Sequence, residues 1–121
     1  MSSSILICDD SNLARKQVLR SLPDALSADV QLATNGQEAL ELLISQKFDI
    51  LFLDLTMPIL DGLGVLQAIK DNNISIAVFV ISADIQPEMQ SKVLALGAKA
   101  FLKKPVKSEV LLEELQQHGF L

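Results

Sequence analysis

The 121-residue sequence predicts an α/β domain built on a parallel sheet. Short aliphatic runs alternate with segments of helical period, five times in succession, and this alternation is typical of strand–helix–strand units. Two of the runs, residues 50–53 and 77–81, are apolar throughout, as expected of strands buried on both faces. We therefore expect one domain over residues 1–121, with five strands and five helices.

The five expected strands are short, and their composition indicates where each lies in the sheet. The second alternates apolar and polar residues and is placed near an edge, whereas the third and fourth are apolar on both faces and are placed centrally. In chain order, the strands are expected at residues 4–8, 30–33, 50–53, 77–81 and 100–102.

Capping and breaking residues set the bounds of the first three helices. Ser11-Asn12 begin the first helix and Pro23 ends it at Leu22. Asn35-Gly36 turn the chain into the second helix, and Asp61-Gly62 precede the third. Apolar spacing of three or four residues marks the faces turned to the core. These are Ala14, Val18 and Leu22 in the first helix, Leu40, Leu43 and Lys47 in the second, and Leu66 and Ile69 in the third.

The last two helices carry similar signals. Pro87 fits the first turn of the fourth helix, Gly97 ends it, and Met89, Val93 and Leu96 recur at its core spacing. Ser108 is expected to cap the fifth helix, which runs through Leu112 and Leu115 to Gly119. Phe120 beyond it is expected either to make the hydrophobic contact of the helix C-cap or to begin a linker.

Composition excludes several classes of function. The net charge is −5, from 10 basic and 15 acidic residues, which disfavours direct binding of nucleic acid. No signal peptide or membrane span is recognisable, and the lone cysteine fits a reducing cytoplasm. Cys8 is expected to act as a small core residue rather than a redox thiol. His118 has no second His or Cys with which to form a metal site.

Polar residues follow four of the five expected strands. Asp9-Asp10 follow the first, Asp54 the third, Ser82 the fourth and Lys104 the fifth. The carboxyl ends of parallel strands open onto one crevice, so these side chains should converge. Clustered carboxylates repel one another unless a cation lies among them, and an oxygen-only site suits a hard divalent ion such as Mg²⁺.

Together these groups fit a phosphoryl site. A metal and a lysine neutralise phosphate oxygens, a hydroxyl donates a hydrogen bond, and the Asp54 carboxylate is the natural nucleophile for forming an acyl phosphate. Taken singly, each has a simpler interpretation: Asp9 or Asp10 as a helix cap, Ser82 as a turn residue and Lys104 as a surface lysine. Two adjacent acids weaken the capping interpretation, because only one of them can cap.

The sequence resembles the response-regulator receiver domains of two-component signalling, of the chemotaxis CheY type, over essentially its whole length. The resemblance implies a flavodoxin-like (βα)₅ three-layer sandwich with strand order 2-1-3-4-5. The residues that carry it are Asp9-Asp10, Asp54, Met57-Pro58, Asp61-Gly62, Ser82-Ala83, Phe101 and Lys104-Pro105.

The resemblance also implies roles for single residues. Asp54 takes a phosphoryl group from the phosphohistidine of a histidine kinase, and Lys104 grips the phosphate. Mg²⁺ is bound directly by Asp10 and Asp54, through water by Asp9, and by the backbone carbonyl of Thr56.

A second group of implied roles concerns the response to phosphorylation. Ser82 swings toward the phosphate and Phe101 turns inward, which changes the face made by the fourth helix, fifth strand and fifth helix. A downstream protein effector binds that face. Thr56 and Asp84 match the pair that tunes the rate of dephosphorylation, and Phe101 lacks the hydroxyl that many relatives carry there.

Three alternatives remain at this point. A Mg²⁺-dependent phosphatase of the haloacid dehalogenase type also uses a strand-end Asp nucleophile, but it needs an acid two residues later, where this chain has Thr56. A degenerate receiver acting as a scaffold is expected to have lost an acid or the lysine. A receiver excised from a longer multidomain regulator fits the same residues. Nucleotide binding is disfavoured, since no glycine-rich phosphate loop follows a strand.

Overall fold

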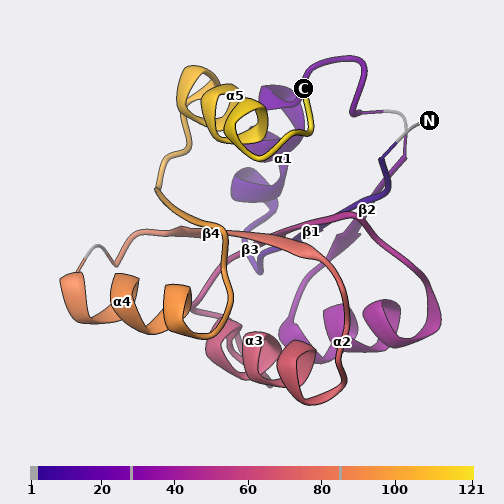
Figure 1. The fold of residues 1–121 in the computed structure, drawn as a ribbon, viewed down its shortest axis with the longest axis vertical. Helices are drawn as coiled ribbons and strands as arrows, with labels where there is room; N and C mark the ends of the chain where they lie inside the picture. The colour runs from indigo at the N-terminus through magenta and orange to yellow at the C-terminus, as the bar shows by residue number, and fades with distance from the viewer. Residues whose placement is uncertain (1–2, 28, 85) are drawn as a thin grey trace.

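The computed structural model describes residues 3–27, 29–84 and 86–121, and it forms a five-stranded sheet covered by helices on both faces (Figure 1). All strand pairings are parallel, in the order β2-β1-β3-β4-β5, which is the predicted flavodoxin-like arrangement. The strands are β1 Ile5–Cys8, β2 Val30–Ala33, β3 Ile50–Leu53, β4 Ala77–Ser82 and β5 Ala100–Lys103. The helices are α1 Asn12–Ser21, α2 Gly36–Ser45, α3 Gly62–Asp71, α4 Pro87–Ala95 and α5 Ser108–Gln117.

The sheet divides the core into two layers. Helices α1 and α5 cover one face, and α2, α3 and α4 cover the other (Figure 1). Because side chains alternate between faces along a strand, Leu6 and Cys8 pack into the second layer, and Ile5 and Ile7 into the first. Strands β1, β3 and β4 are buried along their whole length, so the expectation of central apolar strands is confirmed.

The strand register brings the predicted site to one edge of the sheet. Cys8 is paired with Leu53, and Leu53 with Val80, so β1, β3 and β4 end close together. The Asp54 N–H donates to the Cys8 carbonyl at 3.0 Å, which extends the β1–β3 pairing to the first residue after each strand. The side chains that follow these strands therefore project into a shared space.

Helix caps agree with the sequence at four of the five helices. The side chains of Ser11, Asn35 and Asp61 accept hydrogen bonds from backbone N–H groups in the first turns of α1, α2 and α3. Pro87 lies in the first turn of α4. At the other end, Gly97 has a φ of 105°, the left-handed conformation that glycine adopts readily after a helix.

Two expectations about helices were wrong. The buried residues of α2 are Gly36, Ala39 and Leu43, and Lys47 is exposed beyond the helix end at Ser45, so it does not mark the core face. Ser108 is the first residue of α5 rather than its cap, because the N-cap is Lys107 and makes no capping bond through its side chain. The Ser108 hydroxyl instead donates to the Ser21 hydroxyl of α1, at 3.4 Å.

The end of α5 closes the first core layer. Gly119 has a φ of 83°, and the Phe120 N–H donates to the Leu115 carbonyl at 2.9 Å. The Phe120 ring packs edge-on against Phe79 of β4, which confirms its expected contact beyond the helix. Within the described ranges, no helix has the length and apolar character needed to cross a membrane.

Candidate functional site

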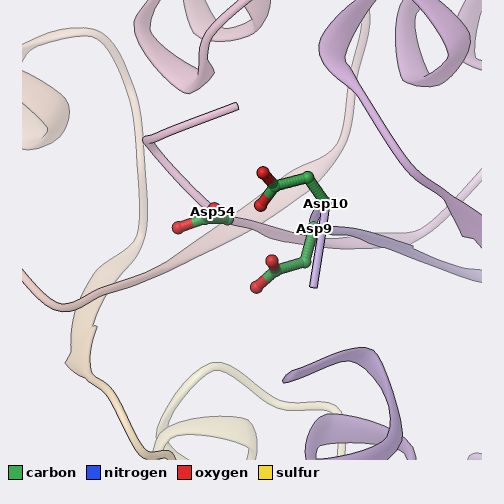
Figure 2. A group of neighbouring side chains, drawn as sticks. All are labelled: Asp9, Asp10 and Asp54. Atoms are coloured by element: carbon green, nitrogen blue, oxygen red, sulfur yellow. The ribbon is translucent and has the colours of Figure 1, made fainter. Parts of the chain in front are cut away.

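Three carboxylates meet where β1 and β3 end. Figure 2 shows Asp9, Asp10 and Asp54 beside one another, with their oxygen atoms turned toward a common space. One oxygen from each residue lies within 4.8 Å of the others. Asp9 and Asp54 are buried, at 4% and 5% exposure, whereas Asp10 is exposed. The predicted convergence of acids at this edge is confirmed.

Lys104, which follows β5, reaches into this cluster. Its Nζ atom lies 2.8 Å from Asp9 Oδ2 and 3.2 Å from Asp54 Oδ1, so one ammonium pairs with both buried carboxylates. Burial by itself lowers the pKa of Lys104, but hydrogen bonds and charge interactions with Asp9 and Asp54 outweigh it and raise the pKa above its usual value. Lys104 is therefore a firmly protonated partner of the two acids.

The same surroundings favour the charged form of Lys104 but disfavour the charged form of Asp54. Burial, followed by the negative charge of Asp9, raises the pKa of Asp54, and Lys104 only partly offsets these effects. Ionised Asp54 is thus held in a site that remains unfavourable to negative charge. A carboxylate with a raised pKa is also more basic, which suits a nucleophile.

Asp9 is bound through every polar group it has. Its N–H donates to the Ala33 carbonyl at 3.1 Å, and its Oδ1 atom accepts the Ser11 N–H at 2.9 Å. With Oδ2 bound by Lys104, both carboxylate oxygens have protein partners. Asp10 differs: among the described residues, nothing donates a hydrogen bond to its carboxylate or forms an ion pair with it.

The donor set fits a divalent cation of the Mg²⁺ type. All three candidate ligands are carboxylates, which such hard ions prefer, and sulfur and imidazole are absent from the cluster. The two buried acids share a single lysine, so the cluster retains an excess of negative charge. A metal ion bound by Asp10 and Asp54 would neutralise that excess.

Ser82 closes the site on the β4 side. It is the last residue of β4 and 1% exposed, and its hydroxyl accepts the Asp84 N–H at 3.0 Å. Its carbonyl accepts the Lys104 N–H at 2.9 Å, which fixes the end of β4 to the start of the loop after β5. Asp84 and Thr56, the pair predicted to tune the reaction rate, line one hollow of about 270 Å³.

Comparison with known proteins identifies this arrangement. The family model described as the response regulator receiver domain matches residues 5–116. The chain belongs to the response regulator receiver domains. It is therefore a phosphoacceptor signalling domain with the fold of its family.

Individual relatives agree with the family. The chain is 31% identical to the peroxide stress-activated histidine kinase mak3 of Schizosaccharomyces pombe, over 98% of this chain and 5% of the kinase. It is 35% identical to the response regulator MprA of Mycobacterium ulcerans, over 96% of this chain and 50% of MprA. The chain therefore spans at most half the length of these two relatives.

A solved structure shows the same likeness in three dimensions. In the CheX–CheY–BeF3–Mg+2 complex of Borrelia burgdorferi, the matching chain superposes with a TM-score of 0.89 at 29% identity. The match covers 96% of this receiver domain and 88% of that chain. Both the fold and the connectivity are thus those of known receivers.

Phe101, the other predicted switch residue, lies in the middle of β5, partly exposed. Its ring packs at the margin of the core layer beneath α4, as do Met89 and Leu96, the two outer members of the expected core face of that helix. The ring is therefore partly buried against the core and partly open to solvent.

One residue of the receiver site, Arg15, was not anticipated from the sequence. Arg15 in α1 donates to the Asp9 carbonyl, with Nη1 and O at 2.6 Å. One feature of the sequence could have indicated it: the helix dipole disfavours a cation near a helix N-terminus, so Arg15 is expected to bind an acceptor there. Gly62, from the Asp61-Gly62 pair named in the sequence analysis, begins α3 against Asp54, and a Cβ added there would lie 2.5 Å from the Asp54 carbonyl oxygen.

Cys8 is a small residue of the core, as expected, and His118 lies at the end of α5. Burial, reinforced by the charges of Asp9 and Asp54, raises the pKa of the Cys8 thiol to about 12, so the thiol is inert at neutral pH. His118 follows α5, lies 3.6 Å from the Glu114 carboxylate, and packs edge-on against Phe79.

Proposed function

We propose that Asp54 is the phosphoacceptor of this receiver domain and that a histidine kinase is its donor. The arrangement of Lys104 between Asp9 and Asp54 carries the proposal, because it places a cation beside a nucleophilic carboxylate. In the transfer, an Oδ atom of Asp54 forms a P–O bond while the P–N bond of the donor phosphohistidine breaks. The bonding electron pair leaves with the imidazole ring.

We propose Mg²⁺ as the cofactor, with Asp10 and Asp54 as direct ligands, the Thr56 carbonyl as a third, and Asp9 acting through water. When bound, Mg²⁺ supplies charge neutralisation between the carboxylate and the incoming phosphoryl group. The protein contacts of both Asp9 oxygens support an indirect role for that residue. The open carboxylate of Asp10 supports a direct one.

Lys104 and Ser82 are the proposed phosphate-binding groups. Lys104 exchanges one of its carboxylate partners for a phosphate oxygen, since both are oxyanions within reach of a single ammonium. Ser82 gives up its hydrogen bond from the Asp84 N–H, and its own O–H group donates a hydrogen bond to the phosphate. The broken hydrogen bond costs about 1 kcal/mol, which a charge-assisted bond to phosphate offsets.

The proposed output is a change in the face formed by α4, β5 and α5. When Ser82 turns toward the phosphate, Phe101 turns inward into the space it leaves. A downstream protein, or an output domain in a longer regulator, binds the altered face. Thr56 and Asp84 set the rate of dephosphorylation; they line one hollow, and each lies two residues after a proposed site residue, Asp54 and Ser82.

We propose that the chemistry of the domain is limited to phosphorylation and dephosphorylation of Asp54, within the single domain of residues 1–121. A phosphatase of the haloacid dehalogenase type needs an acid two residues after its nucleophile, and Thr56 holds that position. Residues 1–2 lie outside the described part of the chain. We assign the domain to the cytoplasm, where kinases are supplied with ATP.

Intact-mass spectrometry after incubation with acetyl phosphate and Mg²⁺ tests the proposed function. The wild-type protein should gain one phosphoryl group, and Asp54→Asn should gain none. Asp71→Asn is the matched control, because Asp71 is an exposed acid at the far end of α3 and should not affect labelling. Equal labelling of Asp54→Asn and the wild type would show that the acceptor is another residue.

A further inference from the structure

Arg15 links helix α1 to the end of β1. Its Nη1 atom donates to the Asp9 carbonyl at 2.6 Å, and its Nη2 atom donates to Asn12 Oδ1 at 3.3 Å. The side chain is half-buried, and α1 has no acidic residue in its first turn to balance it. The helix dipole disfavours a cation at this end, so the contact with the Asp9 carbonyl compensates for an unfavourable position.

The hydrogen bond from Arg15 is accepted by the carbonyl of the peptide group that joins Asp9 to Asp10. The Asp9 carbonyl, the Asp10 N–H and the Asp10 Cα atom belong to one planar unit, so fixing the oxygen restrains the plane that holds the Cα atom from which the Asp10 side chain projects. Asp9 has other anchors, through Ser11 and Lys104. The Asp10 carboxylate has no hydrogen-bond or ion-pair partner among the described residues, so its direction depends on its backbone.

We propose that Arg15 is a positioning residue for Asp10, acting on the carboxylate that binds Mg²⁺ through the backbone before it. The inference rests on the proposed function, since it concerns the same metal site. A partner behind a metal ligand fixes its orientation, and removing such a partner typically weakens metal binding about 10- to 100-fold.

If Arg15 acted only through its charge, its removal would change the Mg²⁺ affinity in the opposite direction. Arg15 is a cation bound to the backbone of Asp9, one of the three clustered acids, so as a bare charge it repels Mg²⁺, and its removal should tighten metal binding. As a positioning residue, Arg15 orders a ligand, and its removal should weaken metal binding. The direction of the change in Mg²⁺ affinity therefore separates the two roles.

NMR titration of ¹⁵N-labelled protein with Mg²⁺ measures this affinity through the amide shifts around Asp10. Arg15→Met keeps most of the aliphatic stem but removes both the charge and the donor. We expect it to bind Mg²⁺ roughly 10-fold more weakly than the wild type. In the metal-free state, the backbone order parameter of Asp10 should fall as well. Arg20→Met is the matched control on the same helix, exposed and away from Asp9, and should leave both readouts unchanged.

Unchanged or tighter Mg²⁺ binding by Arg15→Met would overturn the inference, as would an unchanged order parameter for Asp10. If Arg15→Met does not fold, Arg15→Gln replaces it, with the same expected direction. Asp10→Asn separates a failure of the proposed role of Arg15 from a failure of the proposed Mg²⁺ site. If it loses Mg²⁺ binding while Arg15→Met does not, the inference alone fails. If the wild type shows no Mg²⁺-dependent shifts near Asp10, the proposed metal site fails and the inference fails with it.

Discussion

The Lys104 ammonium lies 2.8 Å from the Asp9 carboxylate, so a cation of the protein itself is bound in the acidic cluster that we assign to Mg²⁺. The same ammonium is 3.2 Å from Asp54. Under the proposed function, metal binding and phosphorylation each bring a new charge to the Asp54 carboxylate with which this ammonium pairs. We therefore expect the stability of the protein without Mg²⁺ and its affinity for Mg²⁺ to be coupled through Lys104.

Lys104→Met should destabilise the metal-free protein by about 2 kcal/mol. Breaking a fully buried ion pair costs about 3–5 kcal/mol, and the 23% exposure of the Lys104 side chain reduces that effect. Urea unfolding with and without Mg²⁺ measures it, and Mg²⁺ should stabilise the variant more than the wild type. Lys103→Met is the control, since Lys103 is exposed and should change the free energy of unfolding by less than about 0.5 kcal/mol. Equal effects of the two substitutions would contradict the account.

Asp54→Asn should stabilise the metal-free protein at neutral pH. The pKa of Asp54 is raised above 3.8, so the folded state binds a proton there more tightly than the unfolded chain does. The stability contributed by this group is complete below pH 3.8 and is lost as the pH rises through the folded-state pKa. Asparagine does not ionise, and Lys104 keeps its pair with Asp9 in the variant.

Thermal melts across pH test this sign. The gain in stability of Asp54→Asn over the wild type should be present at pH 7 and vanish in acid, where Asp54 is protonated in both states. Saturating Mg²⁺ should reverse the order of stability, because the variant loses a ligand. A metal-free Asp54→Asn protein that melts below the wild type at pH 7 would show that Lys104 already overcompensates the buried charge.

Ser82→Ala should leave phosphorylation of Asp54 largely intact and abolish the response of the output face. The hydroxyl is needed to move toward the phosphate, whereas Asp54 and Lys104 perform the transfer. Stability should fall by about 1 kcal/mol, since the Asp84 N–H loses its acceptor. The amide shift of Phe101 on phosphorylation is the readout. A Phe101 shift as large in the variant as in the wild type would remove Ser82 from the switch.

Cys8 should resist alkylation in the folded protein. With a pKa of about 12, only roughly one thiol in ten thousand is ionised at pH 8, and the residue is 1% exposed. Iodoacetamide should modify the urea-unfolded chain rapidly and the native protein only as fast as it unfolds. Comparable rates in the two states would mean that the β1 end opens readily.

The strands and the acidic cluster were predictable because their signals are local. A run of aliphatic residues followed by Asp9-Asp10 or Asp54 defines both a buried strand and the polar group at its end. The face of α2 that packs on the core was harder to predict. The large residue Leu40 was taken as a core contact, whereas the small residue Ala39 is the fully buried one. Close packing of a helix on a sheet favours small side chains, and size alone therefore misleads.

Interactions between distant segments were the harder part. The placement of Lys104 after β5 was predictable, but its double pair with Asp9 and Asp54 was not, because sequence patterns do not specify which of several nearby carboxylates a lysine reaches. The contact of Arg15 with the Asp9 carbonyl was missed because a backbone acceptor leaves no pattern in the side chains. Only the unfavourable position of this cation at a helix N-terminus pointed to it.

The most direct test of the central claim is a crystal structure of the protein with Mg²⁺ and beryllium trifluoride, a mimic of the phosphoryl group. The account predicts the fluoride adduct on an Oδ atom of Asp54, Mg²⁺ bound by Asp10 and Asp54, and Lys104 moved onto a fluorine atom. An adduct on another residue, or an unmodified Asp54 still paired with Lys104, would contradict it.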